Sequence, residues 1–249
     1  MRFLFLVCCL MVSALGSEPV ELKTPEGIVE LEGTLPHVQG IDIEGQSLWV
    51  TSVDRATKRG FLHLFNARTG KLIRQVEVQD GERYHPGGLS RDKDAIWLPV
   101  AEYRRASTSV IQKRNKKTLE LISSFAVADH IGCVAAQNGH LIGGTWDSRD
   151  FYEWDQQGRE ISKRPNPSHT SYQDLKFQGA YLIGSGPTGP SAGLVEWVDR
   201  RSLDVVRRLA LGKTDRGVRY TNEGMAIRGK HIYFLPEDGR SRLFSFRLP

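Results

Sequence analysis

Residues 83–88 read RYHPGG, and residues 219–224 read RYTNEG. In both stretches an apolar residue follows, Leu89 or Met225, and a pair of strand-forming residues comes eight positions later. A six-residue motif that recurs with the same pattern after it predicts that one structural unit is repeated along the chain.

Three more stretches fit the same register. The five copies begin at His37, His85, His130, His169 and Thr221. In four of them an apolar residue stands eleven positions after the first residue, and a carboxylate stands at position seventeen. The copy that begins at His169 needs two extra residues and has Thr188 where the others have an acid.

Each copy contains two short strand-like runs, and most are followed by two more, separated by turn sequences such as NARTGK and DQQGRE. Four antiparallel strands in units of 39 to 52 residues are typical of propeller blades. The last copy ends one strand short, at 242–247, whereas a strand-like run at 27–33 precedes the first copy. The sequence therefore predicts an all-β, five-bladed β-propeller whose last blade is closed by the N-terminal strand.

The N-terminal residues 1–16 have the pattern of a secretory signal peptide. One arginine is followed by an apolar run over 3–12 and then by small residues. This predicts export to the periplasm or the extracellular space, and a single domain over 17–249. The apolar run is too short to span a bilayer, so we expect no stable membrane insertion after cleavage. Cys133 is then the one remaining cysteine, which excludes an internal disulfide in the mature chain.

The charge balance narrows the class of partner. The net charge is +5 over 249 residues, and no dense basic stripe interrupts the strand pattern. We therefore exclude nucleic acid as a partner. We expect a monomer that binds a small molecule, anionic or sugar-like.

Histidines dominate the first position of the repeat. Innermost strands begin on one face of a propeller, so their first residues should converge on one mouth of the central channel. Four imidazoles could hold one divalent transition metal, Fe, Zn, Cu or Ni, because neutral imidazole is a common ligand of these ions. The candidate metal ligands are His37, His85, His130 and His169. The alternative is that these polar side chains only bind water and satisfy strand ends, in which case no cofactor is needed.

Acids and arginines should surround the same mouth. The candidate catalytic residues are Glu223, Asp54, Glu102, Asp147 and Asp238. The candidate ligand-binding residues are Arg83, Arg219, Tyr84, Tyr220 and Arg149. Guanidinium groups bind carboxylates or phosphates bidentately, although each arginine could instead pair with a neighbouring acid and order its loop. We expect the opposite face to be inert.

The repeats resemble those of uncharacterised exported bacterial β-propeller families, with a distant similarity to the gluconolactonase and strictosidine-synthase-like group. The stretch NEGMAI at 222–227 is similar to the Glu-Gly pair that supplies a metal-ligating glutamate in gluconolactonases, and this resemblance implies such a role for Glu223. The other calcium ligands of that group have no match, because histidines stand at the corresponding places. The four histidines at the first position of the repeats resemble the iron site of carotenoid oxygenases, which are propellers whose inner-strand histidines hold iron. This is a similarity of the site and not of ancestry.

Two functions follow from these patterns. The first is a metal-dependent enzyme of hydrolase, lyase or oxygenase type, in which the ion polarises a small substrate or activates water. The second is a non-catalytic propeller that binds a ligand or a protein on the same face.

Overall fold

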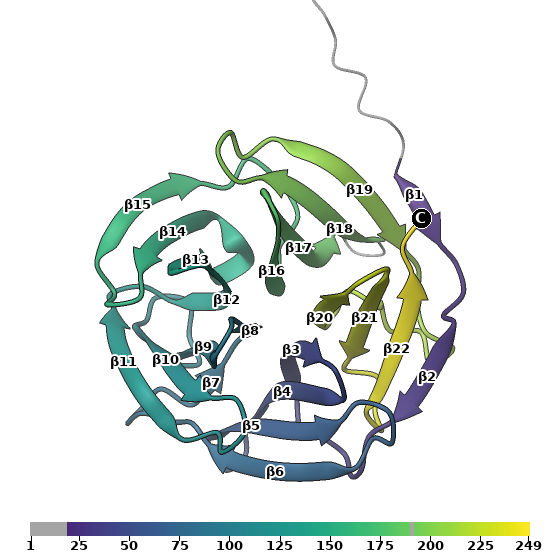
Figure 1. Cartoon of the computed structure of the whole chain (residues 1–249), viewed down its shortest axis with the longest axis horizontal. Coiled ribbons are helices and arrows are strands. Elements are labelled where there is room, and N and C mark those ends of the chain that lie inside the picture. The colour runs from purple at the N-terminus through teal and green to yellow at the C-terminus, as the bar shows by residue number, and fades with distance from the viewer. Residues whose placement is uncertain (1–18, 190–191) are drawn as a thin grey trace, which may run out of the picture.

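The computed structural model describes residues 19–189 and 192–249, and these residues form five sheets around a central axis (Figure 1). The predicted all-β, five-bladed propeller is confirmed. The predicted signal peptide, residues 1–16, lies outside the described residues. Within the described part of the chain, no helix is long and apolar enough to cross a lipid bilayer.

Blades one, two and three are formed by consecutive segments, with the first strand at the axis and the last at the rim (Figure 1). Blade one contains β3 (Val38–Glu44), β4 (Ser47–Asp54), β5 (Arg59–Asn66) and β6 (Leu72–Glu77). Blade two contains β7 (His85–Pro86), β8 (Ser90–Arg91), β9 (Ala95–Ala101), β10 (Ser109–Asn115) and β11 (Leu121–Val127). Blade three contains β12 (Ile131–Gln137), β13 (His140–Thr145), the 3-10 helix η1 (Trp146–Ser148), β14 (Asp150–Asp155) and β15 (Glu160–Pro165).

The N-terminal segment completes the outer edges of the last two blades. Blade four contains β16 (Asp174–Gln178), β17 (Tyr181–Thr188), β18 (Ala192–Asp199) and β19 (Val205–Leu211), with β1 (Val20–Leu22) parallel to β19. Blade five contains β20 (Glu223–Arg228), β21 (His231–Pro236) and β22 (Arg242–Arg247), with β2 (Gly27–Glu30) antiparallel to β22. This pairing confirms the predicted closure of the ring by the N-terminal strand.

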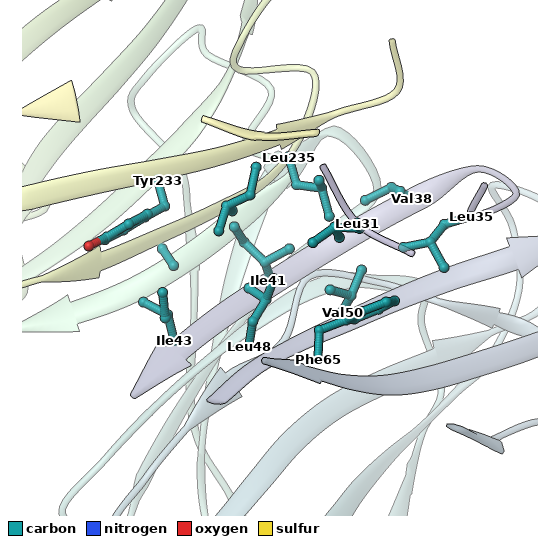
Figure 2. Close-up of a cluster of buried hydrophobic side chains, with 12 residues drawn as sticks. Leu31, Leu35, Val38, Ile41, Ile43, Leu48, Val50, Phe65, Tyr233 and Leu235 are labelled. Carbon is teal, nitrogen blue, oxygen red and sulfur yellow. The ribbon is translucent and has the colours of Figure 1, made fainter. Parts of the chain in front are cut away.

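The core lies between neighbouring blades. Five hydrophobic clusters are each built from two adjacent blades, because every blade presents one apolar face to each neighbour. Figure 2 shows the cluster between blades five and one, where Leu31 packs with Ile41 and Leu235. Leu31 follows β2 directly and is 1% exposed, so the closing segment contributes to the core as well as to the sheet.

A buried ion pair, Asp174 and Lys176, joins four blades at the centre of the ring. The Oδ2 atom of Asp174 accepts backbone N–H groups from Ile41 (3.0 Å) in blade one and Met225 (3.1 Å) in blade five. Lys176 Nζ donates to Asp174 Oδ1 at 2.5 Å and to the Leu89 carbonyl of blade two at 2.7 Å. Neighbouring inner strands are so close here that a Cβ on Gly88 would lie 2.8 Å from Asp174 Oδ1. We call this pair the central ion pair.

Candidate functional site

A pocket of about 170 Å³ opens where the innermost strands begin. All five blades contribute to its walls, which include His37, His85, Tyr103, His130, Tyr172 and Glu223. We call it the histidine pocket. The sequence-predicted convergence on one mouth therefore holds for three of the four histidines and for Glu223.

His37 is held in one tautomer. Its Nε2 atom lies 2.6 Å from the Arg55 guanidinium, 3.0 Å from the Gln39 amide nitrogen and 3.1 Å from the Tyr103 hydroxyl. Guanidinium and amide nitrogens only donate, so Nε2 must be an acceptor. The proton therefore sits on Nδ1 and is donated to Glu237 Oε2 at 2.7 Å. Burial is the main cause that lowers the pKa of His37, so the ring stays neutral at pH 7.

His130 has the same tautomer for a different reason. Its Nδ1 atom lies 2.9 Å from the Arg104 carbonyl oxygen, which can only accept, so Nδ1 carries the proton. The Nε2 atom keeps its lone pair. Burial lowers the pKa of His130 also, and Trp146 packs edge-on against the ring at 4.5 Å between centroids.

His85 lies between these two imidazoles and is 9% exposed. Its ring centroid is 6.3 Å from that of His37, 5.7 Å from that of His130 and 4.4 Å from that of Tyr103. Neither ring nitrogen has a hydrogen-bond partner among the described residues. Burial, followed by the two neighbouring imidazoles, lowers the pKa of His85 to about 3. A buried polar group without a partner is rare in folded proteins and calls for an explanation, such as an ion or ligand.

Glu223 brings a carboxyl group into the same pocket. Its side chain is buried, and Oε2 accepts a hydrogen bond from the Gln39 amide at 3.3 Å. Burial, with a smaller contribution from the Glu237 carboxylate, raises the pKa of Glu223 to about 8. Among the described residues no basic side chain forms an ion pair with it. The backbone is also unusual, since φ is 88° at Glu223 and 33° at His37. Non-glycine residues in such conformations cost energy and gather at functional sites.

One group of three metal-ligating side chains is compact. Ligand atoms of His37, Glu223 and Glu237 all lie within 4.8 Å of one another, and this is the one such group found in residues 19–189 and 192–249. Nitrogens of His85 and His130 extend the same polar surface beyond that spacing. One imidazole and two carboxyl groups thus lie at the spacing of a single cation, with the imidazoles of His85 and His130 beside them.

His169 does not take part, which corrects the four-histidine prediction. Gln137 in blade three and Gln178 in blade four are equivalent, because each ends the inner strand at the first turn of its blade. Gln137 pairs with His140 across that turn, and Gln178 pairs with Tyr181. His130 lies seven residues before Gln137, and the residue seven before Gln178 is Ser171. The two extra residues of the fourth repeat therefore precede the inner strand. They move His169 to an exposed position outside the pocket walls.

Most of the acids at position seventeen of the repeats order their own loops. Asp147 lines the pocket and pairs with Arg105, but the other three are not among its walls. Asp54 accepts the backbone N–H groups of the turn that follows it. Glu102 binds Arg104 and Thr108, and Asp238 is buried against Arg242. The predicted catalytic ring of Asp54, Glu102 and Asp238 is thus replaced by three loop-ordering contacts.

The predicted ligand-binding residues also lie outside the pocket walls. Arg83 binds Asp80 and Thr108, and Arg219 binds the Gly189 carbonyl and Asn222. Tyr84 stacks on Tyr103, so it supports the wall from outside. Tyr220 is buried against Phe244 and Phe246 in the core, and Arg149 is exposed.

Sequence reasoning missed three residues that shape the site: Tyr103, Trp146 and Glu237. Each is the immediate neighbour of a position-seventeen acid, namely Glu102, Asp147 and Asp238. Successive side chains alternate in direction where the chain is extended. Beside Glu102 and Asp238 the acid turns toward its loop and its neighbour contacts His37, whereas Trp146 and Asp147, in η1, both line the pocket. The alternation beside two of the acids was the signal available.

Comparison with one solved structure supports the fold, and two others are less similar. The chain is similar to a structure titled "Crystal Structure of Mitotic Checkpoint Complex", with a TM-score of 0.53 and 10% identity over 90% of this chain and 94% of that chain. The computationally designed Ika4 protein has a TM-score of 0.45 and 16% identity over 71% of this chain and 99% of the design. The Neurospora crassa Pan2 WD40 domain has a TM-score of 0.46 and 12% identity, covering 86% of this chain and 66% of that one. At these identities the similarity concerns the fold alone.

No curated protein matches the sequence. The predicted similarity to gluconolactonases stays a prediction, because none of these matches supports it. Residues 51–175, half of the chain, match the model of a family of unknown function, DUF6454. These residues run from the second strand of blade one to the inner strand of blade four, so the match includes His85 and His130. The chain belongs to this family of unknown function, DUF6454.

Proposed function

We propose that the histidine pocket binds one divalent transition metal ion through His37, His85, His130 and Glu223. One observation carries the proposal: two neutral imidazoles are fixed through Nδ1, and a third, buried between them, has no partner among the described residues. A bound cation would give His85 the partner that it lacks.

The outer contacts match those that metal-binding histidines make. Such histidines usually donate the second ring N–H to a carboxylate or a backbone carbonyl, which fixes the tautomer and the ring orientation. His37 donates to the Glu237 carboxylate and His130 to the Arg104 carbonyl, so Nε2 is the unprotonated nitrogen in both. In His37 this nitrogen accepts from Arg55, Gln39 and Tyr103. Imidazole with carboxylate suits Zn, Fe, Cu or Ni, whereas Ca and Mg prefer oxygen ligands alone.

Arg55, Gln39 and Tyr103 must all leave His37 Nε2 before an ion can bind there, and the nearest of them is Arg55. Its guanidinium binds His37 Nε2, and a metal ligand cannot keep a donor on its coordinating nitrogen. Arg55 is exposed and stacks on Tyr103 at 4.9 Å from the ring centroid, so it can turn outward without unpacking the core. From the rim, the guanidinium would bind an anionic group of a substrate held on the metal.

The pocket suits a small substrate. Its volume of about 170 Å³ admits a few non-hydrogen atoms beside the ion. A metal with four protein ligands and an open position polarises a bound carbonyl or activates water. We therefore propose an exported metal-dependent enzyme, of hydrolase, lyase or oxygenase type, that acts on a small anionic molecule.

His85→Ala should weaken metal binding more than the ~10–100-fold that loss of an outer contact costs, because it removes a ligand. His169→Ala is the matched control, since this histidine belongs to the same repeat column but lies outside the pocket, and its affinity should equal that of the wild type. Calorimetric titration of chelator-treated, untagged protein with Zn²⁺, Fe²⁺, Cu²⁺ and Ni²⁺ measures both.

Thermal unfolding of His85→Ala in the absence of metal checks that the variant is folded. Unchanged affinity in a folded His85→Ala protein would show that the ion is bound elsewhere. A wild-type protein that takes up none of the four ions, yet binds small anions at this mouth, would support the non-catalytic alternative.

A further inference from the structure

The opposite end of the central axis has a pocket of its own, of about 400 Å³. It lies where the innermost strands end, and each of the five blades contributes to its walls, from Asp42 in blade one to Arg228 in blade five. We call it the turn-side pocket. From the sequence we expect an inert face here, and no pocket is predicted.

The central ion pair separates the two pockets. Lys176 forms part of the floor of the turn-side pocket, and its ammonium group binds the Leu89 carbonyl and Asp174. Asp174 in turn holds backbone N–H groups of blades one and five. The turn-side pocket is therefore a site independent of the histidine pocket.

The two acids in the walls are occupied by internal contacts. Asp42 accepts the backbone N–H groups of Ile43 (2.7 Å) and Arg91 (2.8 Å). Asp92 accepts two backbone N–H groups of its own turn, and its Oδ2 accepts the Trp97 indole N–H at 3.1 Å. Both carboxylates thus hold the turns in place and have little capacity left for a cationic ligand.

Two of the four cations in the walls have no acidic partner. The Lys93 side chain is exposed and forms no hydrogen bond or ion pair with the described residues. Arg228 binds only uncharged oxygens there, the Gly45 carbonyl and the Tyr233 hydroxyl at 2.7 Å. The other two cations are compensated, since Arg91 pairs with Glu44 and Lys176 with Asp174.

From this charge distribution we infer that the turn-side pocket binds a small multivalent oxyanion, a phosphate or a phosphorylated small molecule, through Lys93 and Arg228. Four cationic and two acidic side chains line the pocket, and a concave site with more cations than acids in its walls concentrates anions from solution. The Arg228 guanidinium offers paired N–H donors to oxyanions, and Lys93 adds an exposed ammonium from the wall of blade two.

The test is a calorimetric titration with inorganic phosphate at low ionic strength. The wild type should bind, and a Lys93→Ala/Arg228→Gln variant should bind at least tenfold more weakly, because it lacks both charged hydrogen-bond donors. Lys71→Ala/Lys213→Ala is the matched control, because it removes two exposed cations outside the pocket walls and should leave the affinity unchanged.

Arg228 packs on Tyr233, so thermal unfolding must first show that the double variant is folded. If it is unstable, Lys93→Ala alone should still lower the affinity severalfold. The inference is overturned if wild-type protein binds no phosphate, or if the Lys93 variants bind it as tightly as the control. Either result leaves the metal proposal for the other mouth untouched.

Discussion

A chain that begins at Thr34 should lose most of its stability, because it lacks the strand that closes the ring. β2 supplies four registered pairs to β22, and Leu31 fills the cluster between blades five and one. Removal of one buried leucine side chain alone costs about 2–5 kcal/mol. Each lost ladder hydrogen bond adds roughly 1 kcal/mol, and the exposed edge of β22 favours aggregation.

We expect the melting temperature to fall by roughly 10–20 °C, on the scale of 2–4 °C per kcal/mol for a domain of this size. The matched control is a chain that begins at Pro25, which lacks only the parallel strand β1. That strand is short, and Val20 is 53% exposed, so the loss should be much smaller. Differential scanning calorimetry compares the two. Equal melting temperatures for the two truncated chains would contradict the closure of the ring by β2.

Asp174→Ala should be the most damaging single substitution near the axis. It leaves the Lys176 ammonium buried without its counter-ion, and it removes the acceptor of two backbone N–H groups from different blades. Breaking one partner of a buried ion pair typically costs about 3–5 kcal/mol, a large share of a total stability of about 5–15 kcal/mol. Urea unfolding at pH 7 should show this loss as a lower midpoint.

The double variant Asp174→Ala/Lys176→Met tests the reason for the loss. Without the ammonium no unpaired charge is buried, so the double variant should be more stable than Asp174→Ala alone. An Asp174→Ala protein with the midpoint of the wild type would show that the central ion pair does not hold the blades together.

Much of the fold could be predicted because four of the five repeats share one register. An apolar residue eleven positions after each first residue, such as Leu48 or Ile96, lies on the second strand of its blade and is fully buried. The closing strand could be predicted because β22 would otherwise expose a free edge. Both inferences depend on local periodicity and on backbone hydrogen bonding, which sequence patterns express directly.

The site could be predicted only in part. The position of a residue in the repeat tells at which mouth of the channel it lies, but not in which direction its side chain points. His85 and His130 turn into the channel, whereas Asp54 turns back to bind its own loop. Two inserted residues displaced His169, and the strand pairing at the turn Gln178–Tyr181 places them before the inner strand. Glu237, which fixes the tautomer of His37, comes from blade five, and such contacts between blades depend on tertiary packing.

The central claim is that one metal ion joins blades one, two, three and five at the histidine pocket. The most direct measurement is X-ray diffraction from crystals of untagged protein, soaked in Zn²⁺ and recorded at the zinc absorption edge. We predict one strong anomalous peak at about 2.0–2.2 Å from nitrogens of His37, His85 and His130 and from an oxygen of Glu223, with Arg55 turned away. Crystals that show zinc elsewhere, or no peak in this pocket while Arg55 remains on His37, would contradict the account.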